Sequence, residues 1–320
     1  MKTHLFVVLP VILLVFAGTA FAFEGPLGVK NQFPMFLHVD APRLESAVSE
    51  DSFSTELSHS SVFVMRNSVD WTVDLDMEIT ELDIRFKKII PGHVEIGVEV
   101  PVVVAGSGFM DDFLDSYHKT FGFSDYGRDS RPANSFLYEV RRGGALVIRG
   151  KNGEVGIGDV RLTAKKELLR NDPAVSVRAE VELPTGDASD GHGSGSIDAG
   201  IAILADKKIG ERFMSYWNAG VIFPGTLRAR EDVALRTSYY AGVGVEAAFW
   251  RSFSLLGQIT FQTSPFPETG IGAVDRIAAL LTLGGRYSSG KDSFEISLTE
   301  DPNTAGAPDV TFNLNYKRRF

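Results

Sequence analysis

The sequence TFNLNYKRRF, residues 311–320, ends the chain on a bare aromatic side chain. Phe312, Leu314 and Tyr316 alternate with polar residues, and a period of two places the apolar side chains on one face of a β-strand. Such a strand turns its apolar face either to a protein core or to lipid. The rest of the sequence has to distinguish between these two environments.

The same alternation recurs along the chain. After the Pro91-Gly92 turn, HVEIGVEVPVVV (93–104) has valine or isoleucine at every second position, over about the length that a tilted strand needs to cross a bilayer. Similar segments predict an all-β chain of about twelve antiparallel strands. They span residues 52–64, 71–90, 93–104, 156–168, 174–184, 196–207, 212–223, 238–250, 252–263, 277–288, 292–300 and 309–319.

The segment 71–90 is too long for one simple span, and its apolar phase changes after Ile79. One extra residue in a strand exchanges its two faces, so the change of phase predicts a β-bulge near Thr80. Two strands joined by an unrecognised turn would produce the same pattern.

The connections between these segments alternate in length. Tight joints are predicted at 91–92, 171–173, 210–211, 250–251 and 290–291. Long polar loops are predicted at 105–155, 185–195, 224–237, 264–276 and 301–308. Short periplasmic turns and long extracellular loops are the layout of a transmembrane β-barrel, whose even strand number brings both chain ends to the short-turn rim. A soluble secreted β-sandwich would also alternate, but it does not need this asymmetry.

The final strand resembles the C-terminal assembly signal of bacterial outer-membrane proteins. Phe312, Leu314, Tyr316 and Phe320 match its alternate apolar positions and aromatic end, whereas Arg318 departs from it. An arginine at the membrane rim can extend to the headgroups. The resemblance implies the barrel-assembly machinery as a partner during biogenesis, with outer-membrane lipid and lipopolysaccharide around the finished barrel.

The first 22 residues have the features of a cleaved signal peptide, with Lys2, an apolar stretch and Ala20-Phe21-Ala22 as the cleavage site. They predict export through the periplasm to the outer membrane. Residues 23–51 are interpreted as a periplasmic N-terminal arm before a barrel of residues 52–320. Insertion of this arm into the lumen as a plug is an alternative, motivated by the neighbouring Phe33, Phe36 and Leu37.

Composition excludes several classes of function. The chain has no cysteine and a formal net charge of −9 without a basic tract, which argues against a disulfide scaffold and against nucleic acid as a partner. No apolar run beyond the signal peptide is long enough for a transmembrane helix.

Several segments resemble an uncharacterised proteobacterial outer-membrane β-barrel family, domain of unknown function 3187. They include GPLGVKNQFP (25–34), PVVVAGSGFMDDFLDSYHKTFG (101–122), GRDSRPANSF (127–136) and SLTEDPNTAGAPD (297–309). The pair GIGD and LPTGD, within 156–187, is also similar to outer-membrane barrels of phenol meta-cleavage pathways. The resemblance implies an outer-membrane barrel and implies no activity.

Charged residues of both signs are predicted on the inward faces of the first strands. The candidates for a lumen lining are Arg85, Glu95, Glu99, Arg161, Lys165, Arg178, Glu180 and Glu182. They could select among ions and small solutes, or form cross-strand ion pairs that fill a narrow interior. Because the opposite signs neutralise each other, the second interpretation is favoured.

The opposite wall is predicted to be lined by small and apolar residues, among them Gly242, Gly244, Leu256 and Gly284. They could leave a cleft for an apolar or aromatic solute. Alternatively, the glycines only permit the curvature of the barrel.

The long loop 105–155 contains Phe109, Phe113, Tyr117 and Phe121 at intervals of four residues, which predicts a short helix with an aromatic stripe. Loops of this length are often lids or binding elements, so the stripe is a candidate gate over the mouth of the barrel. The alternative is a self-packed external cap with a small hairpin around Gly143-Gly144.

The expected function is that of a narrow channel for passive passage of a small solute, with apolar or aromatic compounds as candidates. A structural or surface-interaction barrel without transport is the alternative. A barrel-embedded hydrolase is more distant, since only the loop with Asp187, Asp190, His192 and Ser194 offers an acid–histidine pair. We therefore expect no enzymatic activity, no catalytic residues, no metal and no cofactor.

Overall fold

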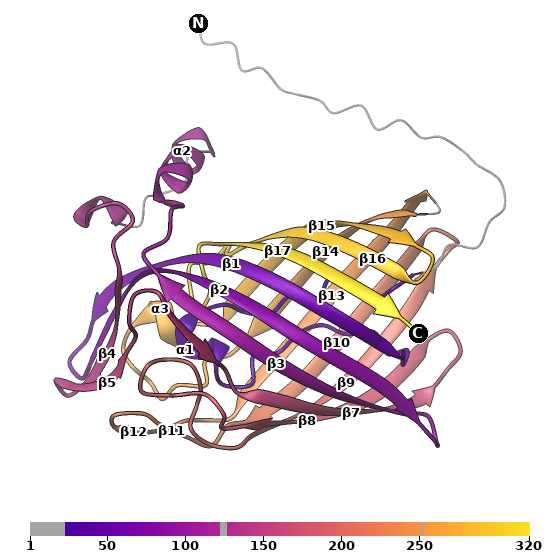
Figure 1. Cartoon of the computed structure of the whole chain (residues 1–320), viewed down its shortest axis with the longest axis horizontal. Coiled ribbons are helices and arrows are strands. Elements are labelled where there is room, and N and C mark those ends of the chain that lie inside the picture. The colour runs from indigo at the N-terminus through magenta and orange to yellow at the C-terminus, as the bar shows by residue number, and fades with distance from the viewer. Residues whose placement is uncertain (1–22, 122–126, 251) are drawn as a thin grey trace, which may run out of the picture.

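The computed structural model describes residues 23–121, 127–250 and 252–320; the predicted signal peptide lies outside them. Within these ranges, twelve antiparallel strands form one sheet that closes on itself (Figure 1). The strands are β1 (Ser52–Asn67), β2 (Trp71–Ile90), β3 (Val94–Gly106), β7 (Val160–Leu169), β8 (Ala174–Leu183), β9 (Asp198–Ile209), β10 (Phe213–Phe223), β13 (Ser238–Trp250), β14 (Phe253–Gln262), β15 (Ala278–Ser289), β16 (Asp292–Glu300) and β17 (Val310–Arg319). The predicted fold class and strand number are confirmed.

The barrel closes through β1 and β17, which pair from Ser52↔Arg319 to Ser61↔Val310. The tight turns and the C-terminus lie at one rim, and the long loops lie at the other (Figure 1). The backbone N–H of Phe320 donates to the carbonyl of Asp51, so the last residue is held beside the start of the first strand. We refer to this end as the periplasmic rim.

The long loops carry the remaining elements. At the long-loop end of the barrel, which we call its upper end, β4 (Leu137–Arg142) pairs with β2 and forms a hairpin with β5 (Ala145–Arg149). There β6 (Glu154–Ile157) pairs with β3. The others are α1 (Pro34–Leu37), α2 (Asp111–Phe121), the 3-10 turn η1 (Arg128–Ser130), β11 (Thr226–Arg228), β12 (Asp232–Ala234) and α3 (Gly272–Asp275). None of the described helices is long and apolar enough to cross a membrane.

The two faces of the barrel have the polarity of a membrane protein. Outward side chains are apolar and exposed, as at Leu314, which is 53% exposed, whereas inward side chains are polar and buried, as at Glu56, which is 1% exposed. A soluble β-sandwich would bury the apolar face instead. The exposed apolar belt therefore faces lipid.

The predicted bulge near Thr80 is wrong. β2 pairs with β1 and with β3 without a shift of register, and its odd-numbered residues face inward from Trp71 to Lys87. The apolar phase changes because the surroundings change along one regular strand. In the upper part Trp71, Val73 and Leu75 pack into an internal hydrophobic core, whereas the outward carboxylates of that part bind the loop 107–135.

Candidate functional site

Residues 24–50 form a hairpin inside the barrel, which we call the N-terminal hairpin. It enters at the periplasmic rim, where Glu24 pairs with Arg319, and it turns at α1 near the extracellular end. It then returns to Ser52, and a β-bridge between Lys30 and Arg43 joins its two arms. The predicted boundary at residue 52 coincides with the start of β1, but the prediction of a periplasmic arm is corrected, because this segment occupies the lumen.

Ion pairs join the middle of the N-terminal hairpin to the wall. Lys30 Nζ lies 2.8 Å from a carboxylate oxygen of Glu81 and 3.2 Å from Asp83. The guanidinium of Arg43 lies 2.8 Å from Asp83 and 2.5 Å from Glu99. The two cations of the hairpin therefore neutralise a group of wall carboxylates.

Towards the periplasmic rim, the signs are reversed. Glu45 of the hairpin lies 2.7 Å from Lys87 and 3.4 Å from Arg178. Lys165 donates to the backbone carbonyls of Ser46 and Val48, at 3.0 Å each. Here the cations of the wall hold the acidic and backbone groups of the hairpin.

Two further arginines hold the ends of the hairpin. Arg161 lies 2.9 Å from Asp40 and 3.4 Å from Glu182, and Arg286 donates to the carbonyl of Gly25 at 2.7 Å. The buried ions Lys30, Asp40, Arg43 and Glu45 of the hairpin each have an oppositely charged partner on the wall, as buried ions require.

The structure brings all eight predicted lumen-lining residues into the interior, where they are buried: Arg85, Glu95, Glu99, Arg161, Lys165, Arg178, Glu180 and Glu182. Their pairing partners lie both on neighbouring strands and on the N-terminal hairpin. Their role in selectivity stays a prediction. Sequence reasoning missed Lys30, Asp40, Arg43 and Glu45. A segment that is buried against a polar lumen needs no regular spacing of apolar residues, so its sequence does not reveal that it is buried.

The small residues of the opposite wall make room for the N-terminal hairpin. A Cβ placed on Gly242 would lie 2.7 Å from a methyl carbon of Leu44, and one on Gly284 would lie 3.0 Å from a methyl carbon of Leu27. One on Gly244 would lie 3.5 Å from Pro26 Cβ. The space that the sequence suggested as a solute cleft is therefore filled by the chain itself.

Replacement of Gly242 by leucine tests this packing. A larger side chain would clash with Leu44, so we expect the returning arm of the hairpin to leave its seat and to become more susceptible to a protease. Gly257→Leu is the matched control, since Gly257 faces outward on the neighbouring strand β14. Limited proteolysis of both variants in detergent, with mass spectrometry of the fragments, measures the difference. Equal protection of the hairpin in both variants would contradict the packing role of Gly242.

The tip of the N-terminal hairpin closes the extracellular end. The rings of Phe33 and Phe36 meet edge to face at 5.1 Å, and Phe36 stacks on Phe266 at 6.4 Å. Trp71 of β2 contacts the same Phe266 from the wall. Beside the lower hairpin, one remaining cavity has about 50 Å³, far below the roughly 300–1,000 Å³ of small-molecule sites. In this conformation the lumen is closed.

The two described aromatic side chains of the long loop, Phe109 and Phe113, do not lie over the mouth. The predicted helix is present as α2, but Phe109 stacks on His59 at 5.0 Å and Phe113 lies 5.9 Å from Phe312, both on the outer face of the wall. The loop is held there because the carboxylate of Glu78 accepts the backbone N–H groups of Phe109 and Met110. The prediction of a gate is therefore wrong for Phe109 and Phe113. The side chains of Tyr117 and Phe121 lie outside the described residues.

The hydrolase candidates do not form a catalytic arrangement. The hydroxyl of Ser194 donates to the carbonyl of Ser196, and the carboxylate of Asp190 is bound by Lys151 and Arg230. Burial lowers the pKa of His192. The described part of the chain also holds no group of three or more His, Cys, Asp or Glu side chains placed to bind a metal ion.

Residues 3–320 match the model of the family described as "Protein of unknown function (DUF3187)". The chain belongs to this family. Its fold is similar to that of the COG4313 outer membrane channel from Pseudomonas putida F1, with 14% identity over 85% of this chain and 96% of that one, and a TM-score of 0.56. For the NanC porin the values are 7% identity, 84% and 100% coverage, and a TM-score of 0.51. No curated protein matches the sequence. Strand count, lipid-facing belt and these folds together make the DUF3187 protein an outer-membrane β-barrel.

Proposed function

We propose that this DUF3187 protein is a channel for small solutes that its N-terminal hairpin closes, and that it opens when the hairpin moves within or out of the lumen. The supporting observation is how the hairpin is held. It contacts the wall through side chains and through bonds from wall side chains to its backbone, and it adds no strand to the sheet. The hairpin can therefore move without breaking the strand ladder that closes the barrel. The similar fold of the Pseudomonas putida outer membrane channel supports the same class of function.

A structural barrel without transport is the second candidate. The observation that favours it is the small space of about 50 Å³ between the lower hairpin and the wall. If the hairpin never moves, this barrel conducts neither ions nor solutes.

A reversible disulfide distinguishes the two candidates. The 3.5 Å between Pro26 Cβ and a Cβ built on Gly244 lies at the lower end of the range for disulfides, roughly 3.5–4.5 Å. The chain has no cysteine of its own, so Pro26→Cys with Gly244→Cys would introduce the single possible bridge. In planar bilayers we expect the reduced variant to conduct as the wild type does. The oxidised variant should be silent, because its hairpin is tied to β13.

The single variant Pro26→Cys controls for the redox treatment and should conduct equally in both states. If the oxidised double variant conducts as well as the reduced one, movement of this arm is not needed for opening. If the wild type and the reduced variant are both silent, the structural barrel is favoured.

A further inference from the structure

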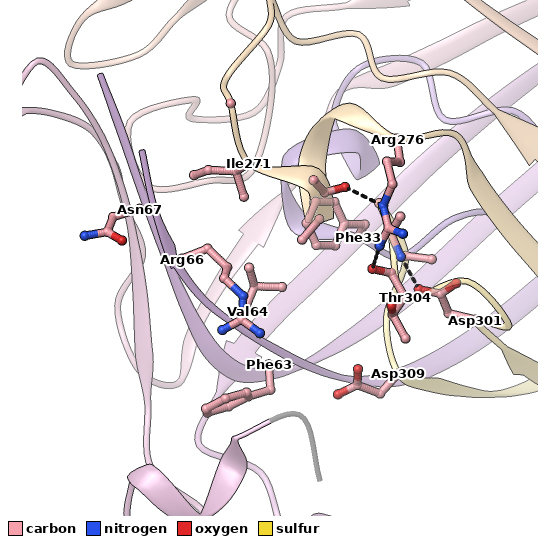
Figure 2. A pocket seen from close by; sticks show the side chains of 16 residues that line it. Phe33, Phe63, Val64, Arg66, Asn67, Ile271, Arg276, Asp301, Thr304 and Asp309 are labelled. Atoms are coloured by element: carbon pink, nitrogen blue, oxygen red, sulfur yellow. Dashed lines mark hydrogen bonds between the residues drawn. The ribbon is translucent and has the colours of Figure 1, made fainter. Parts of the chain in front are cut away.

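A cavity of about 330 Å³ lies at the extracellular end, beside the tip of the N-terminal hairpin. It is enclosed by the upper end of β1, by the loops 270–276 and 301–309, and by Phe33 of the hairpin (Figure 2). Its volume falls within the range of small-molecule sites, roughly 300–1,000 Å³. None of the functional assignments made above uses this cavity.

The cavity exists because the barrel wall is incomplete at this height. The last pair between β1 and β17 is Ser61↔Val310, but β1 continues to Asn67. In the described chain, residues 62–67 have no partner strand on that side, and the loop 301–309 faces them instead. An unpaired strand edge presents backbone N–H and C=O groups to whatever enters.

The lining combines an apolar surface with two guanidinium groups. Val64 and Ala273 supply accessible apolar area over the buried Phe33 and Ile271, and Figure 2 shows Arg66 and Arg276 on different sides of Phe33. Arg66 donates to the backbone carbonyl of Met65, and Arg276 donates to the carbonyls of Gly272, Asn303 and Thr304. Among the described residues, neither guanidinium lies within ion-pair distance of a carboxylate.

The two acids of the cavity are already engaged. Asp309 contacts Arg128, and the carboxylate of Asp301 accepts the backbone N–H groups of Asn303 and Ala305. The positive charges of Arg66 and Arg276 are therefore left for a ligand. Arginine binds a carboxylate with two parallel hydrogen bonds, which makes it suited to this group.

We infer that this cavity is a binding site for a small aromatic carboxylate, whose ring packs on Val64 and Ala273 while Arg66 binds the anionic group. This goes beyond the proposed channel function, because the ligand need not cross the membrane. The lumen beneath carries an excess of carboxylates, which opposes the passage of the same anion. Binding at this site instead places the ligand against the tip of the N-terminal hairpin.

The site predicts a pH dependence whose direction can be stated. Burial raises the pKa of Asp301 to about 7, with a further contribution from Asp309. Besides Asp309, the charged residues that line the cavity together with Asp301 are Arg66 and Arg276. Asp301 is ionised and repels an anion at pH 8, and it is mostly protonated at pH 6. A carboxylate ligand with an ordinary pKa of about 4 stays ionised over this range. Its affinity should therefore rise as the pH falls from 8 to 6.

Calorimetric titration of the full-length protein in detergent tests the inference, with benzoate as the probe. Benzyl alcohol has the same ring without the charge, and acetate has the charge without the ring. We expect saturable binding of benzoate, weakened about tenfold by Arg66→Gln, which corresponds to about 1.4 kcal/mol. Arg149→Gln is the matched control, since Arg149 is an exposed arginine on β5 that does not line the cavity.

Benzyl alcohol should bind more weakly than benzoate, and Arg66→Gln and pH should not change its binding. Absence of saturable benzoate binding, or equal binding of benzoate and benzyl alcohol, would overturn the inference. An unchanged benzoate affinity in a folded Arg66→Gln variant would do the same. If that variant fails to fold, the pH series on the wild type decides, because a flat profile for benzoate also contradicts the site. The titration needs no membrane, so a silent channel would not affect it.

Discussion

Deletion of residues 24–45 should convert the closed barrel into an open pore that prefers cations. The deleted segment supplies the hairpin contacts of the lumen except those that residues 46–50 make near the periplasmic rim, and the twelve paired strands do not include it. The barrel should therefore assemble without it. We expect a steady conductance several-fold above that of the wild type. The reversal potential should shift towards the equilibrium potential of the cation.

The expected selectivity follows from the charges that remain on the wall. Acidic side chains outnumber basic ones among the buried, inward-facing residues of the described strands. The acids are Glu56, Glu81, Asp83, Glu95, Glu99, Glu180, Glu182, Asp198, Asp206, Glu246 and Glu295; the bases are Arg85, Arg161, Lys165, Arg178 and Arg286. The partly buried Lys87, Lys317 and Glu167 also face the lumen, and with them the acids still outnumber the bases. The deletion removes two bases, Lys30 and Arg43, and three acids, Glu24, Asp40 and Glu45, so the acidic excess of the wall itself remains. A lining with one predominant sign concentrates ions of the opposite sign.

Planar-bilayer recordings under a potassium chloride gradient measure both quantities. Heat-modifiable mobility on gels serves as the control for correct assembly of the shortened barrel. An assembled variant that stays silent would contradict the proposal that the hairpin is what closes the lumen. An open pore that prefers anions would contradict the account of the wall charges.

The strands were readable from the sequence, because a barrel wall has water-like surroundings on one side and lipid on the other. The alternation in 93–104 and 311–319 follows directly from this difference. The change of apolar phase in β2 has the same physical origin. At the upper end of β2, the inward side chains contact Phe266 and the tip of the hairpin instead of water. The apolar phase therefore changes there, although the backbone stays regular.

The occupied lumen was less predictable for a physical reason. A segment buried in a charged interior contains charged residues such as Lys30, Arg43 and Glu45. Its sequence therefore looks like that of a solvent-exposed arm. The neighbouring Phe33, Phe36 and Leu37 were the one indication of burial. The orientation of α2 was also hidden, since the spacing of Phe109 and Phe113 predicts a helix but not the surface it covers. That surface includes His59 and Phe312, which lie far away in the sequence.

Replacement of Arg43 by methionine should loosen the N-terminal hairpin more than any single exposed charge does. Arg43 is 2% exposed and compensates Asp83 and Glu99. Loss of one partner of a buried ion pair costs about 3–5 kcal/mol, because the other charge stays buried without compensation. When the hairpin leaves, water reaches both carboxylates. The cost therefore falls on hairpin docking and not on the strand ladder, and the undocked population should rise on the order of a hundredfold or more.

Trypsin cleavage after Lys30 measures this population, since the bond is accessible only when the hairpin undocks. Lys88→Met is the matched control: Lys88 also pairs with a carboxylate, Asp51 at 2.6 Å, but its side chain is 51% exposed. An exposed pair contributes about 0–1 kcal/mol, so cleavage should barely change. Adding Asp83→Asn to Arg43→Met should restore part of the protection, because it removes one of the uncompensated charges. If both methionine variants are cleaved at the wild-type rate, the ion pairs of Arg43 do not hold the hairpin, and the apolar contacts of its tip must do so.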